Sequence, residues 1–258
     1  MGQATAFERM LITGANRIAD GAVLFVGFHW PMLMARVARR LHAPNIVVVY
    51  ENGIVEDRLT PIFPTSPCDL TAAEQATTCA SSLEALYMWL GAGRVQMTML
   101  EAAIVDRFGN INTTVIGDYD SPKTRLPGSG GACEIAINAR NVFVIMRQSS
   151  RSFVEKIDFR TSPGNLGGAE QAERIRKAGG WKGRGPFVVV TDLGIWHFDD
   201  DGEMRLDFLH PGATLDQIRA TIAWEPRISP ALATTPAPTA EELRLVREEL
   251  DPEGVYTK

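Results

Sequence analysis

The sequence predicts a single α/β domain with a mixed, mainly parallel β-sheet flanked by helices. Two continuous apolar runs of strand length, AVLFVGF at 22–28 and NIVVVY at 45–50, enclose a segment with helical periodicity. A strand, a helix and a strand at this spacing form a βαβ unit, whose two strands run parallel and are buried on both faces. The chain has 258 residues, of which 45% are hydrophobic, enough for one large α/β domain or two small ones.

The first quarter of the chain has the clearest periodic patterns. Residues 5–20 have helical spacing and end at Asp20-Gly21, a typical helix terminator. Proline is favoured at a helix start, so a second helix is expected from Pro31 onward. Its apolar and basic faces should lie opposite each other, and they comprise Leu33, Met34, Val37, Ala38 and Leu41 on one side and Arg36, Arg39 and Arg40 on the other.

The middle of the chain alternates irregular stretches with short strands. Residues 52–80, which include three prolines, and the glycine-rich residues 117–131 show no clean period. Long loops of this kind in compact domains are usually functional. The stretch 106–110 (DRFGN) indicates a hairpin turn between two strands. The other elements expected here are helices at 82–91, 132–139 and 168–178, and strands at 96–105, 111–116 and 141–146.

The last third of the chain predicts a sheet edge followed by a separate tail. After a strand at 187–190, the strands 194–198 and 203–209 should pair across an Asp-rich turn, and a helix is expected at 215–222. Thr239-Ala240-Glu241-Glu242 fits a helix start, and that helix should run to Leu250 before Pro252. We expect residues 1–229 to form the α/β domain, and residues 230–258 to be a proline-rich linker (230–238) and a C-terminal helix that packs on the domain or on a partner.

Composition excludes several classes of function. The net charge of -5 and a pI near 5.5 give no attraction to phosphate backbones, so no nucleic-acid partner is expected. No apolar run approaches the length of a membrane span, and no signal peptide is present. The cysteines Cys68, Cys79 and Cys133 are odd in number and form no metal-binding pair. These features indicate reduced thiols, a cytoplasmic location and no bound metal.

Glu51 is the first candidate for chemistry. Glu51-Asn52-Gly53 follows a buried strand directly, and ligands in open α/β sheets bind outside the carboxyl ends of the strands. Gly53 allows a sharp turn with positive φ. Position alone leaves a second interpretation open, in which Glu51 is a solvated acid in an ordinary turn.

A glycine-rich loop is the second candidate. Gly128-Ser129-Gly130-Gly131-Ala132 precedes a predicted helix, and successive glycine amides in such a loop can bind a phosphate or the oxyanion of a thioester carbonyl. The pattern matches neither nucleotide-binding fingerprint, and Ser129 is not in a nucleophile elbow. A plain flexible turn explains the bare pattern equally well.

The remaining reactive residue types have structural explanations. None of the four histidines has a metal-binding spacing, although His29 follows a buried strand and could face a site. His42 ends a helix, where a cation is favourable. Cys68 and Cys79 are better explained as small hydrophobic residues than as reactive thiols. Asp199-Asp200-Asp201 lacks the spaced ligands of a calcium loop and is typical of a hairpin turn.

Several segments together resemble a known family, the class I coenzyme A-transferases, and in particular the B-type subunits of enzymes such as glutaconate coenzyme A-transferase. The similarity is collinear over nearly the whole chain. Its most specific part is the middle block, where GNxN, IGDY, PKTR and GSGGA follow one another at fixed spacing. The segments are APNIVVVYENG (43–53), VDRFGNINTTVIGDYDSPKTRLPGSGGA (105–132), EKIDFRTSPG (155–164), VVVTDLGIWHF (188–198) and LRLVREELDP (243–252).

The resemblance implies a function and a partner. In such enzymes the site lies between two subunits, and the B-type glutamate, here Glu51, attacks an acyl-coenzyme A and becomes a glutamyl-coenzyme A thioester before a second carboxylate takes the coenzyme A. The GxGGA loop lies beside the thioester. The resemblance thus implies an A-type (alpha) partner chain in a hetero-oligomer, no permanently bound cofactor, and coenzyme A as substrate and covalent adduct. Lys123 and Arg125 are candidates for binding a substrate carboxylate.

Other functions remain open on the same fold. A hydrolase acting on acyl-coenzyme A, a ring-cleaving hydrolase or a decarboxylase would share the scaffold, although the strand-end glutamate favours transfer. A metabolite-binding domain without turnover is a further alternative. Tyr50, which precedes Glu51 where a smaller residue is common in the family, is expected either to narrow the acyl pocket or to change which acyl group fits.

Overall fold

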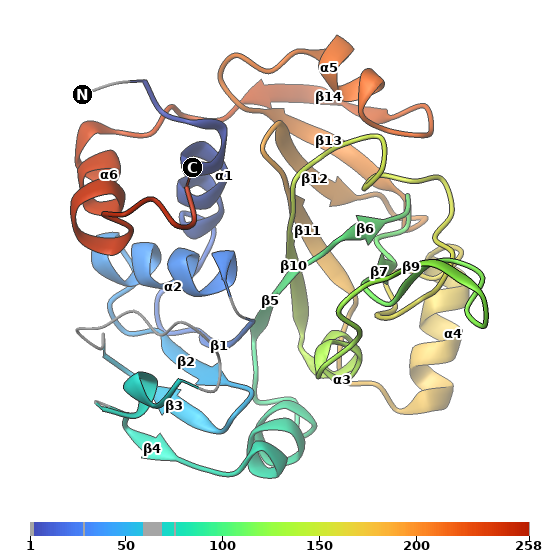
Figure 1. Ribbon diagram of the computed structural model, residues 1–258. Helices are drawn as coiled ribbons and strands as arrows, with labels where there is room; N and C mark the ends of the chain where they lie inside the picture. The colour runs from blue at the N-terminus through green and yellow to red at the C-terminus, as the bar shows by residue number, and fades with distance from the viewer. Residues whose placement is uncertain (1–2, 28, 59–68, 75, 258) are drawn as a thin grey trace.

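The computed structural model describes residues 3–27, 29–58, 69–74 and 76–257, and these form one large mixed sheet with helices on both faces (Figure 1). Within the described residues this sheet has ten strands, in the order β14-β13-β12-β11-β10-β5-β1-β2-β3-β4. The α/β fold predicted from the sequence is confirmed. The helical elements are α1 (Ala6–Ala15), α2 (Trp30–Leu41), η1 (Leu70–Ala73), η2 (Glu84–Leu90), α3 (Ala132–Asn138), α4 (Ala169–Gly179), α5 (Leu215–Ala220), α6 (Ala240–Arg244) and η3 (Leu245–Leu250).

Two small antiparallel pairs, β6–β7 and β8–β9, stand apart from this sheet. The strands are β1 (Val23–Val26), β2 (Val47–Tyr50), β3 (Ile54–Glu56), β4 (Thr78–Cys79), β5 (Met97–Glu101), β6 (Ile104–Val105), β7 (Ile111–Asn112), β8 (Val115–Gly117), β9 (Pro122–Arg125), β10 (Asn141–Ile145), β11 (Pro186–Val190), β12 (Gly194–Phe198), β13 (Met204–Leu209) and β14 (Arg227–Thr234).

Five adjacent strands, β11, β10, β5, β1 and β2, run parallel and form the centre of the sheet. Their side chains belong to two hydrophobic clusters, one on each face of the sheet. The helices α1, α2 and α6 cover one face through residues such as Leu11, Leu33 and Leu243. The elements α3 and η2 cover the other face through Ile135 and Leu90. Burial on both faces explains why these strands are continuous apolar runs without alternation.

The C-terminal helix packs on the N-terminal helices of the same chain, and the two termini lie close together (Figure 1). Its start is the capping box expected at Thr239, in which the Glu242 carboxylate accepts from the Thr239 amide at 2.7 Å. Arg247 donates two hydrogen bonds to the carboxylate of Glu8 on α1, at 2.6 and 2.8 Å. A bidentate pair of this kind stabilises the contact and also fixes the relative orientation of its two partners. The C-terminal helix is therefore held in a defined position on α1.

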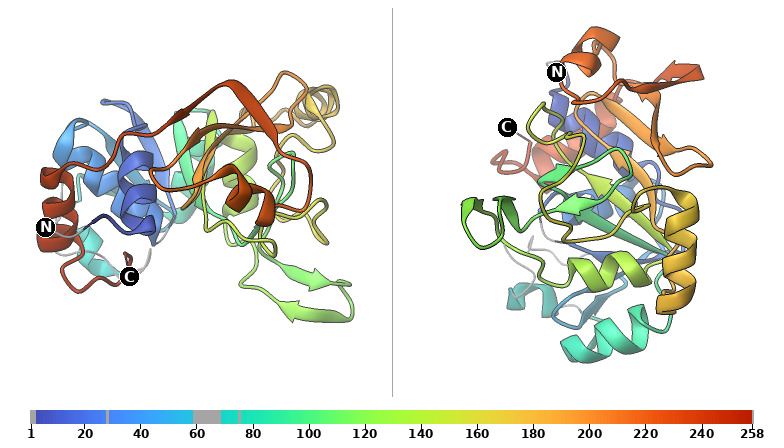
Figure 2. Two further views of the ribbon diagram at one scale, coloured as in Figure 1. Left: turned by 90° about the horizontal axis from the view of Figure 1, so that it is seen from above. Right: turned by 90° about the vertical axis from the view of Figure 1, so that its right-hand side faces the viewer.

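Three short strands lie in the two stretches that were expected to be irregular. β3 pairs antiparallel with β2, β4 with β3, and β9 with β8. Strands of two to four residues are too short to show an alternating pattern, and they form here because a neighbouring strand supplies hydrogen-bond partners. The β8–β9 hairpin projects from the body of the molecule (Figure 2, left).

The expectation of a linker at 230–238 is wrong for its first half. Residues Arg227–Thr234 form β14, which pairs parallel with β13 at the edge of the sheet. Pro230 is tolerated in this strand because an edge strand can leave one side without ladder bonds. The alanine- and proline-rich composition of β14 does not predict a strand, and β14 forms because it pairs with β13.

The predicted hairpins are confirmed, and the GNxN motif is part of the first one. β6 pairs antiparallel with β7, and β12 with β13. The buried side chain of Asn110 accepts hydrogen bonds from the amides of Gly164 and Leu166, at 2.9 and 3.1 Å, and donates to Asp106 at 2.8 Å. The motif thus joins the hairpin to a distant loop, which is a structural role.

Candidate functional site

Glu51 lies in the tight turn between β2 and β3, at the carboxyl end of a central parallel strand. The Tyr50 carbonyl accepts from the Gly53 amide at 3.0 Å, and Oδ1 of Asn52 accepts from the amide two residues further on, also at 3.0 Å. Gly53 has a φ of +94°, and a Cβ there would lie 2.0 Å from the carbonyl oxygen of Ala80. Asn52 and Gly53 therefore shape the turn, and Glu51 is left half-buried within it.

The glycine-rich loop leads into α3 and contains two glycines with positive φ. Gly128 has a φ of +102° and Gly130 a φ of +48°, conformations that glycine adopts without a steric penalty. The Gly128 amide donates to the Thr113 carbonyl at 2.7 Å, and the Ala132 amide to the Ser129 carbonyl at 2.9 Å. These bonds hold both ends of the loop in place.

The fold brings Glu51 and this loop together, although 77 to 81 positions separate them along the chain. A Cβ built on Gly131 would lie 2.7 Å from Oε1 of Glu51 and 3.0 Å from its Cδ. A Cβ on Gly130 would lie 3.9 Å from the same oxygen. Glycine is thus required at position 131 if the carboxylate is to keep this position.

The loop also provides hydrogen-bond donors beside the carboxylate. Within the described residues, the main-chain amides of Gly130 and Gly131 donate to no protein acceptor. A carboxylate next to such amides can add to an acyl carbonyl while the amides bind the oxyanion that forms. The geometry is therefore suited to acyl transfer.

The sequence matches the coenzyme A transferase family over residues 7–221. The chain belongs to the coenzyme A-transferase family. It is 42% identical over 241 residues to the B subunit of 3-oxoadipate CoA-transferase from Pseudomonas knackmussii, a match that covers 93% of this chain and 91% of the relative. It is 33% identical over 251 residues to the B subunit of glutaconate CoA-transferase from Acidaminococcus fermentans, covering 95% of this chain and 92% of the relative.

Solved structures show the same fold. The crystal structure of glutaconate coenzyme A-transferase from Acidaminococcus fermentans aligns with a TM-score of 0.90 and 32% identity, covering 98% of this chain and 97% of that chain. The decarboxylase AibA/AibB aligns with a TM-score of 0.82 and 27% identity, with the same coverage of each chain.

A buried charged cluster lies beneath the turn that carries Glu51 in this coenzyme A-transferase chain. The Tyr50 hydroxyl donates to Glu56 at 2.9 Å, so Tyr50 points into the core rather than into an acyl pocket as expected. Burial and the Glu56 carboxylate raise the pKa of this hydroxyl, so it stays protonated as a donor. Arg39 donates to the Glu56 side chain at 3.4 Å and to its carbonyl at 3.0 Å, and Arg36 lies 4.0 Å from the carboxylate.

The cluster also corrects the expectation for α2, since Arg36 and Arg39 are only 5% and 7% exposed. On this helix Arg40 alone keeps an exposed guanidinium, which bonds to Glu249. Because Glu56 and Tyr50 belong to β3 and β2, the buried charges link the two arms of the turn to α2. The buried charges therefore support the position of Glu51.

Replacing Glu56 with alanine is expected to destabilise the fold by about 3–5 kcal/mol, because removing one partner leaves buried charge without compensation. Tyr50→Phe, which removes a single hydrogen bond, should lower the free energy of unfolding by about 1–3 kcal/mol. Urea unfolding of both variants measures the difference. Equal stability of Glu56→Ala and the unchanged protein would contradict the supporting role.

Sequence reasoning missed one charged residue near this edge of the sheet. Glu101 is the last residue of β5, and its carboxylate lies 2.9 Å from Nδ1 of His29, which follows β1. Glu101 ends an apolar strand, as the residue before Glu51 does, and this position could have indicated it. No glycine-rich or turn pattern follows Glu101, however, so the sequence does not single it out. For His29 the sequence indicates only that a residue after a buried strand could face a site.

The other candidates have contacts within their own elements or are exposed. Arg125 lies over the Tyr119 ring at 4.7 Å and donates to the carbonyl of the same residue, so it is engaged within the β8–β9 hairpin. Lys123 is exposed on β9. Cys79 is exposed at the sheet edge, whereas burial raises the pKa of the half-buried Cys133 thiol. Cys68 lies outside the described residues.

The remaining histidines are structural. Nδ1 and Nε2 of His210 lie 2.9 Å from Thr235 Oγ1 and the Thr191 carbonyl, and burial lowers the pKa of His210 to about 4. His42 contacts a main-chain carbonyl, and His197 pairs with an aspartate at 2.9 Å. The described part of the chain contains no group of three or more His, Cys, Asp or Glu side chains arranged for a metal. Every helix in this part is too short or too polar to cross a bilayer.

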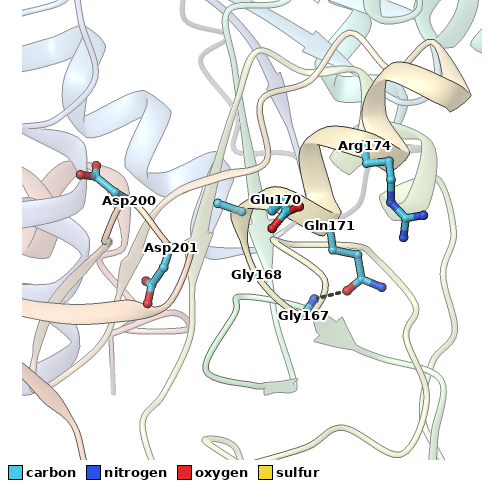
Figure 3. A pocket seen from close by; sticks show the side chains of 8 residues that line it. Gly167, Gly168, Glu170, Gln171, Arg174, Asp200 and Asp201 are labelled. Atoms are coloured by element: carbon cyan, nitrogen blue, oxygen red, sulfur yellow. Dashed lines mark hydrogen bonds between the residues drawn. The ribbon is translucent and has the colours of Figure 1, made fainter.

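A pocket at the start of α4 is lined by three acidic side chains and by one basic side chain, that of Arg174 (Figure 3). The Ala169 amide donates to the Asp201 carbonyl at 2.8 Å, and the Gly167 amide donates to the Gln171 side chain at 2.9 Å. Two amides at this end of the pocket thus already have acceptors within the protein. Glu170, Asp200 and Asp201 outnumber Arg174, so the pocket has an excess of negative charge, which is unfavourable for an anion such as coenzyme A.

Proposed function

We propose that this chain is the B-type subunit of a coenzyme A-transferase that uses Glu51 as a covalent nucleophile. The observation that carries the proposal is the position of the Glu51 carboxylate against Gly131, beside two main-chain donors of the same loop. Any residue larger than glycine at position 131 would displace the Glu51 carboxylate from this place. A carboxylate is a weak nucleophile, so it needs to be held against the carbonyl that it attacks.

The reaction proceeds by two exchanges at acyl carbons. The Glu51 carboxylate adds to the thioester carbonyl of an acyl-coenzyme A. The C–S bond then breaks, coenzyme A leaves as a thiolate, and a mixed anhydride between the acyl group and Glu51 remains. The thiolate then adds to the Glu51 acyl carbon and releases the first acid as a carboxylate. The acceptor carboxylate reverses both steps. Amides such as those of Gly130 and Gly131 would stabilise each oxyanion, at roughly 3–4 kcal/mol per donor.

The substrates are an acyl-coenzyme A and a free acid, most simply a dicarboxylic acid. The names of the two relatives at 42% and 33% identity specify 3-oxoadipate and glutaconate, which are both dicarboxylates. Because one carboxylate replaces another on coenzyme A, the exchange is nearly thermoneutral. The proposal therefore includes no permanently bound cofactor and no nucleoside triphosphate.

We expect the chain alone to show no transferase turnover, because the relatives are named as B subunits and the proposed site needs an A-type partner. Co-expression with an A-type chain should restore turnover in the range typical of enzymes, about 1–1000 s⁻¹. The measurement is a screen of coenzyme A thioesters with free acids, on the single chain and on the purified complex. Transfer at such a rate by the single chain would contradict the shared site.

Decarboxylation is a second candidate, since the decarboxylase AibA/AibB aligns with a TM-score of 0.82. The same screen separates the two functions. A transferase consumes the thioester only when an acceptor acid is present, whereas a decarboxylase or a hydrolase consumes it in water alone.

A further inference from the structure

Thr113 bonds the start of the glycine-rich loop in both directions. Its carbonyl accepts from the Gly128 amide at 2.7 Å, and its Oγ1 donates to the Gly128 carbonyl at 2.8 Å. The Thr114 carbonyl accepts from the Leu126 amide at 3.0 Å. Thr113 and Thr114 connect β7 to β8, so this connection lies beside the chain that leads into the loop.

The connection is also bonded to Thr161, which lies 48 positions further along the chain than Thr113. The Thr161 Oγ1 accepts from the Thr113 amide at 2.9 Å and lies 2.7 Å from the Oγ1 of Thr114. The main chain of Thr161 is itself held, since its amide donates to the Ile111 carbonyl of β7 at 2.9 Å. Thr161 is 5% exposed and belongs to the segment EKIDFRTSPG (155–164). A distant segment thus helps to determine where Thr113 lies.

The buried Asn112 sets the shape of the connection. Its Oδ1 accepts from the amides of Thr114 and Val115 at 3.0 and 3.2 Å, and its Nδ2 donates to the Val115 carbonyl at 2.7 Å. Asparagine side chains stabilise turns through bonds of this kind to their own backbone. The Thr113 hydroxyl is therefore not needed to form the turn, and it bonds to the loop instead.

The glycine-rich loop needs an anchor because glycine has more backbone freedom than any other residue. Its far end is fixed by α3, where the Gly131 carbonyl accepts from the Ile135 amide at 2.9 Å. Its near end is fixed at Gly128 by Thr113. With both ends fixed, the main-chain amides of Gly130 and Gly131 keep one direction beside the proposed nucleophile.

We propose that Thr113 is a positioning residue, whose hydroxyl fixes the start of the glycine-rich loop and so directs the amides of the loop at the reacting carbonyl. This inference rests on the proposed function, and it adds the group that keeps the oxyanion donors in place. Donors that are held before the reaction stabilise an oxyanion without a cost of reorganisation. Because the oxyanion forms only during the reaction, loss of the hydroxyl should lower kcat and leave the KM for the acyl-coenzyme A nearly unchanged.

The test uses the complex of this chain with its A-type partner. The substrates are the thioester and the free acid that the complex turns over fastest, with 3-oxoadipate among the acids tried. Thr113→Val removes the hydroxyl and keeps the size and branching of the side chain. It should lower kcat by about 10- to 100-fold, which is less than the loss of about 100- to 1000-fold when an oxyanion donor is removed altogether. The KM for the thioester should change by less than about threefold.

Conservative and matched variants make the test specific. Thr113→Ser keeps the hydroxyl and should retain kcat within about twofold. Thr113→Ala removes the same hydroxyl in a smaller side chain, and it replaces Thr113→Val in the comparison if that variant does not fold. Thr234→Val is the matched control and should change neither constant, because Thr234 is exposed on β14, at the edge of the sheet far from β2.

The bond from Thr161 is tested in the same way. Thr161→Val leaves the Thr113 amide without this acceptor, so kcat should fall in the same direction as in Thr113→Val. Thr161→Ser, which keeps the oxygen, should retain kcat. Urea unfolding of each variant checks that activity is measured on folded protein.

An unchanged kcat in the variants that lack the Thr113 hydroxyl, an equal loss in Thr113→Ser, or a higher KM at an unchanged kcat would overturn the inference. Borohydride trapping at position 51 separates it from the proposed function. If Glu51 is labelled in the unchanged enzyme while the variants without the hydroxyl keep full turnover, only the role of Thr113 fails. If the unchanged enzyme transfers coenzyme A without a label at Glu51, the covalent mechanism fails.

Discussion

Replacing Glu51 with alanine is expected to abolish coenzyme A transfer by the assembled enzyme. A well-placed intramolecular group has an effective molarity of about 10⁵ M or more. The rate of transfer should therefore fall by about 10⁵-fold when no acid at position 51 can form the intermediate. Glu51→Asp should lose about 100-fold, because one missing methylene withdraws the carboxylate by about 1 Å. Stability should change by less than about 1 kcal/mol, since Glu51 lies half-buried in a turn.

The covalent intermediate can be trapped directly. A thioester is reduced by borohydride far more readily than a free carboxylate, so acyl-coenzyme A followed by borohydride should inactivate the complex, and borohydride alone should not. Peptide mass spectrometry should find the reduced side chain at position 51. Glu225→Ala, at a largely exposed acid, is the control and should keep full activity. Full activity of Glu51→Ala, or a label on Cys68 or Cys79, would exclude the proposed mechanism.

Replacing Gly131 with alanine is expected to reduce transfer by about 100-fold while the fold is retained. The φ of Gly131 is -83°, which alanine adopts without strain, so the effect comes from the new Cβ alone. That atom would lie 2.7 Å from Oε1 of Glu51, and moving the carboxylate away by about 1 Å misplaces the nucleophile. Gly131→Val, with a larger side chain, should be still less active. Steady-state rates and urea unfolding measure the two effects separately.

The control for Gly131 is a glycine where an added methyl group meets nothing. Gly180 caps α4 with a φ of +64°, and no heavy atom lies within 4 Å of a Cβ built there. Gly180→Ala should therefore lose about 1 kcal/mol of stability from backbone strain and keep its activity. Normal transfer by Gly131→Ala would show that the loop is only a turn.

The central part of the fold was predictable because burial on both faces leaves a strong local signal. The apolar runs 22–28 and 45–50 correspond to β1 and β2, and the helix from Pro31 corresponds to α2. Element ends were less accurate. α1 stops at Ala15 rather than at residue 20, and the strand expected at 96–105 is divided into β5 and β6.

The strands that were missed depend on their neighbours. β3 contains too few alternating residues to be recognised locally, and β14 too many alanines and prolines. Each forms by pairing with its neighbour, β3 with β2 and β14 with β13. The same limit applies to charge. Arg36 and Arg39 follow a pattern typical of an exposed helix face, and partners from other elements, among them Glu56 and the Ile46 carbonyl, make their burial favourable.

The sequence by itself determined the α/β class, the strand-end position of Glu51 and the glycine-rich character of residues 128–132, because each depends on a few neighbouring residues. Only the tertiary structure decided that the Glu51 carboxylate lies against Gly131, and that His29, after β1, contacts Glu101 at the end of β5. Contacts between residues some 70 to 80 positions apart are set by strand order and register, and no local pattern encodes these.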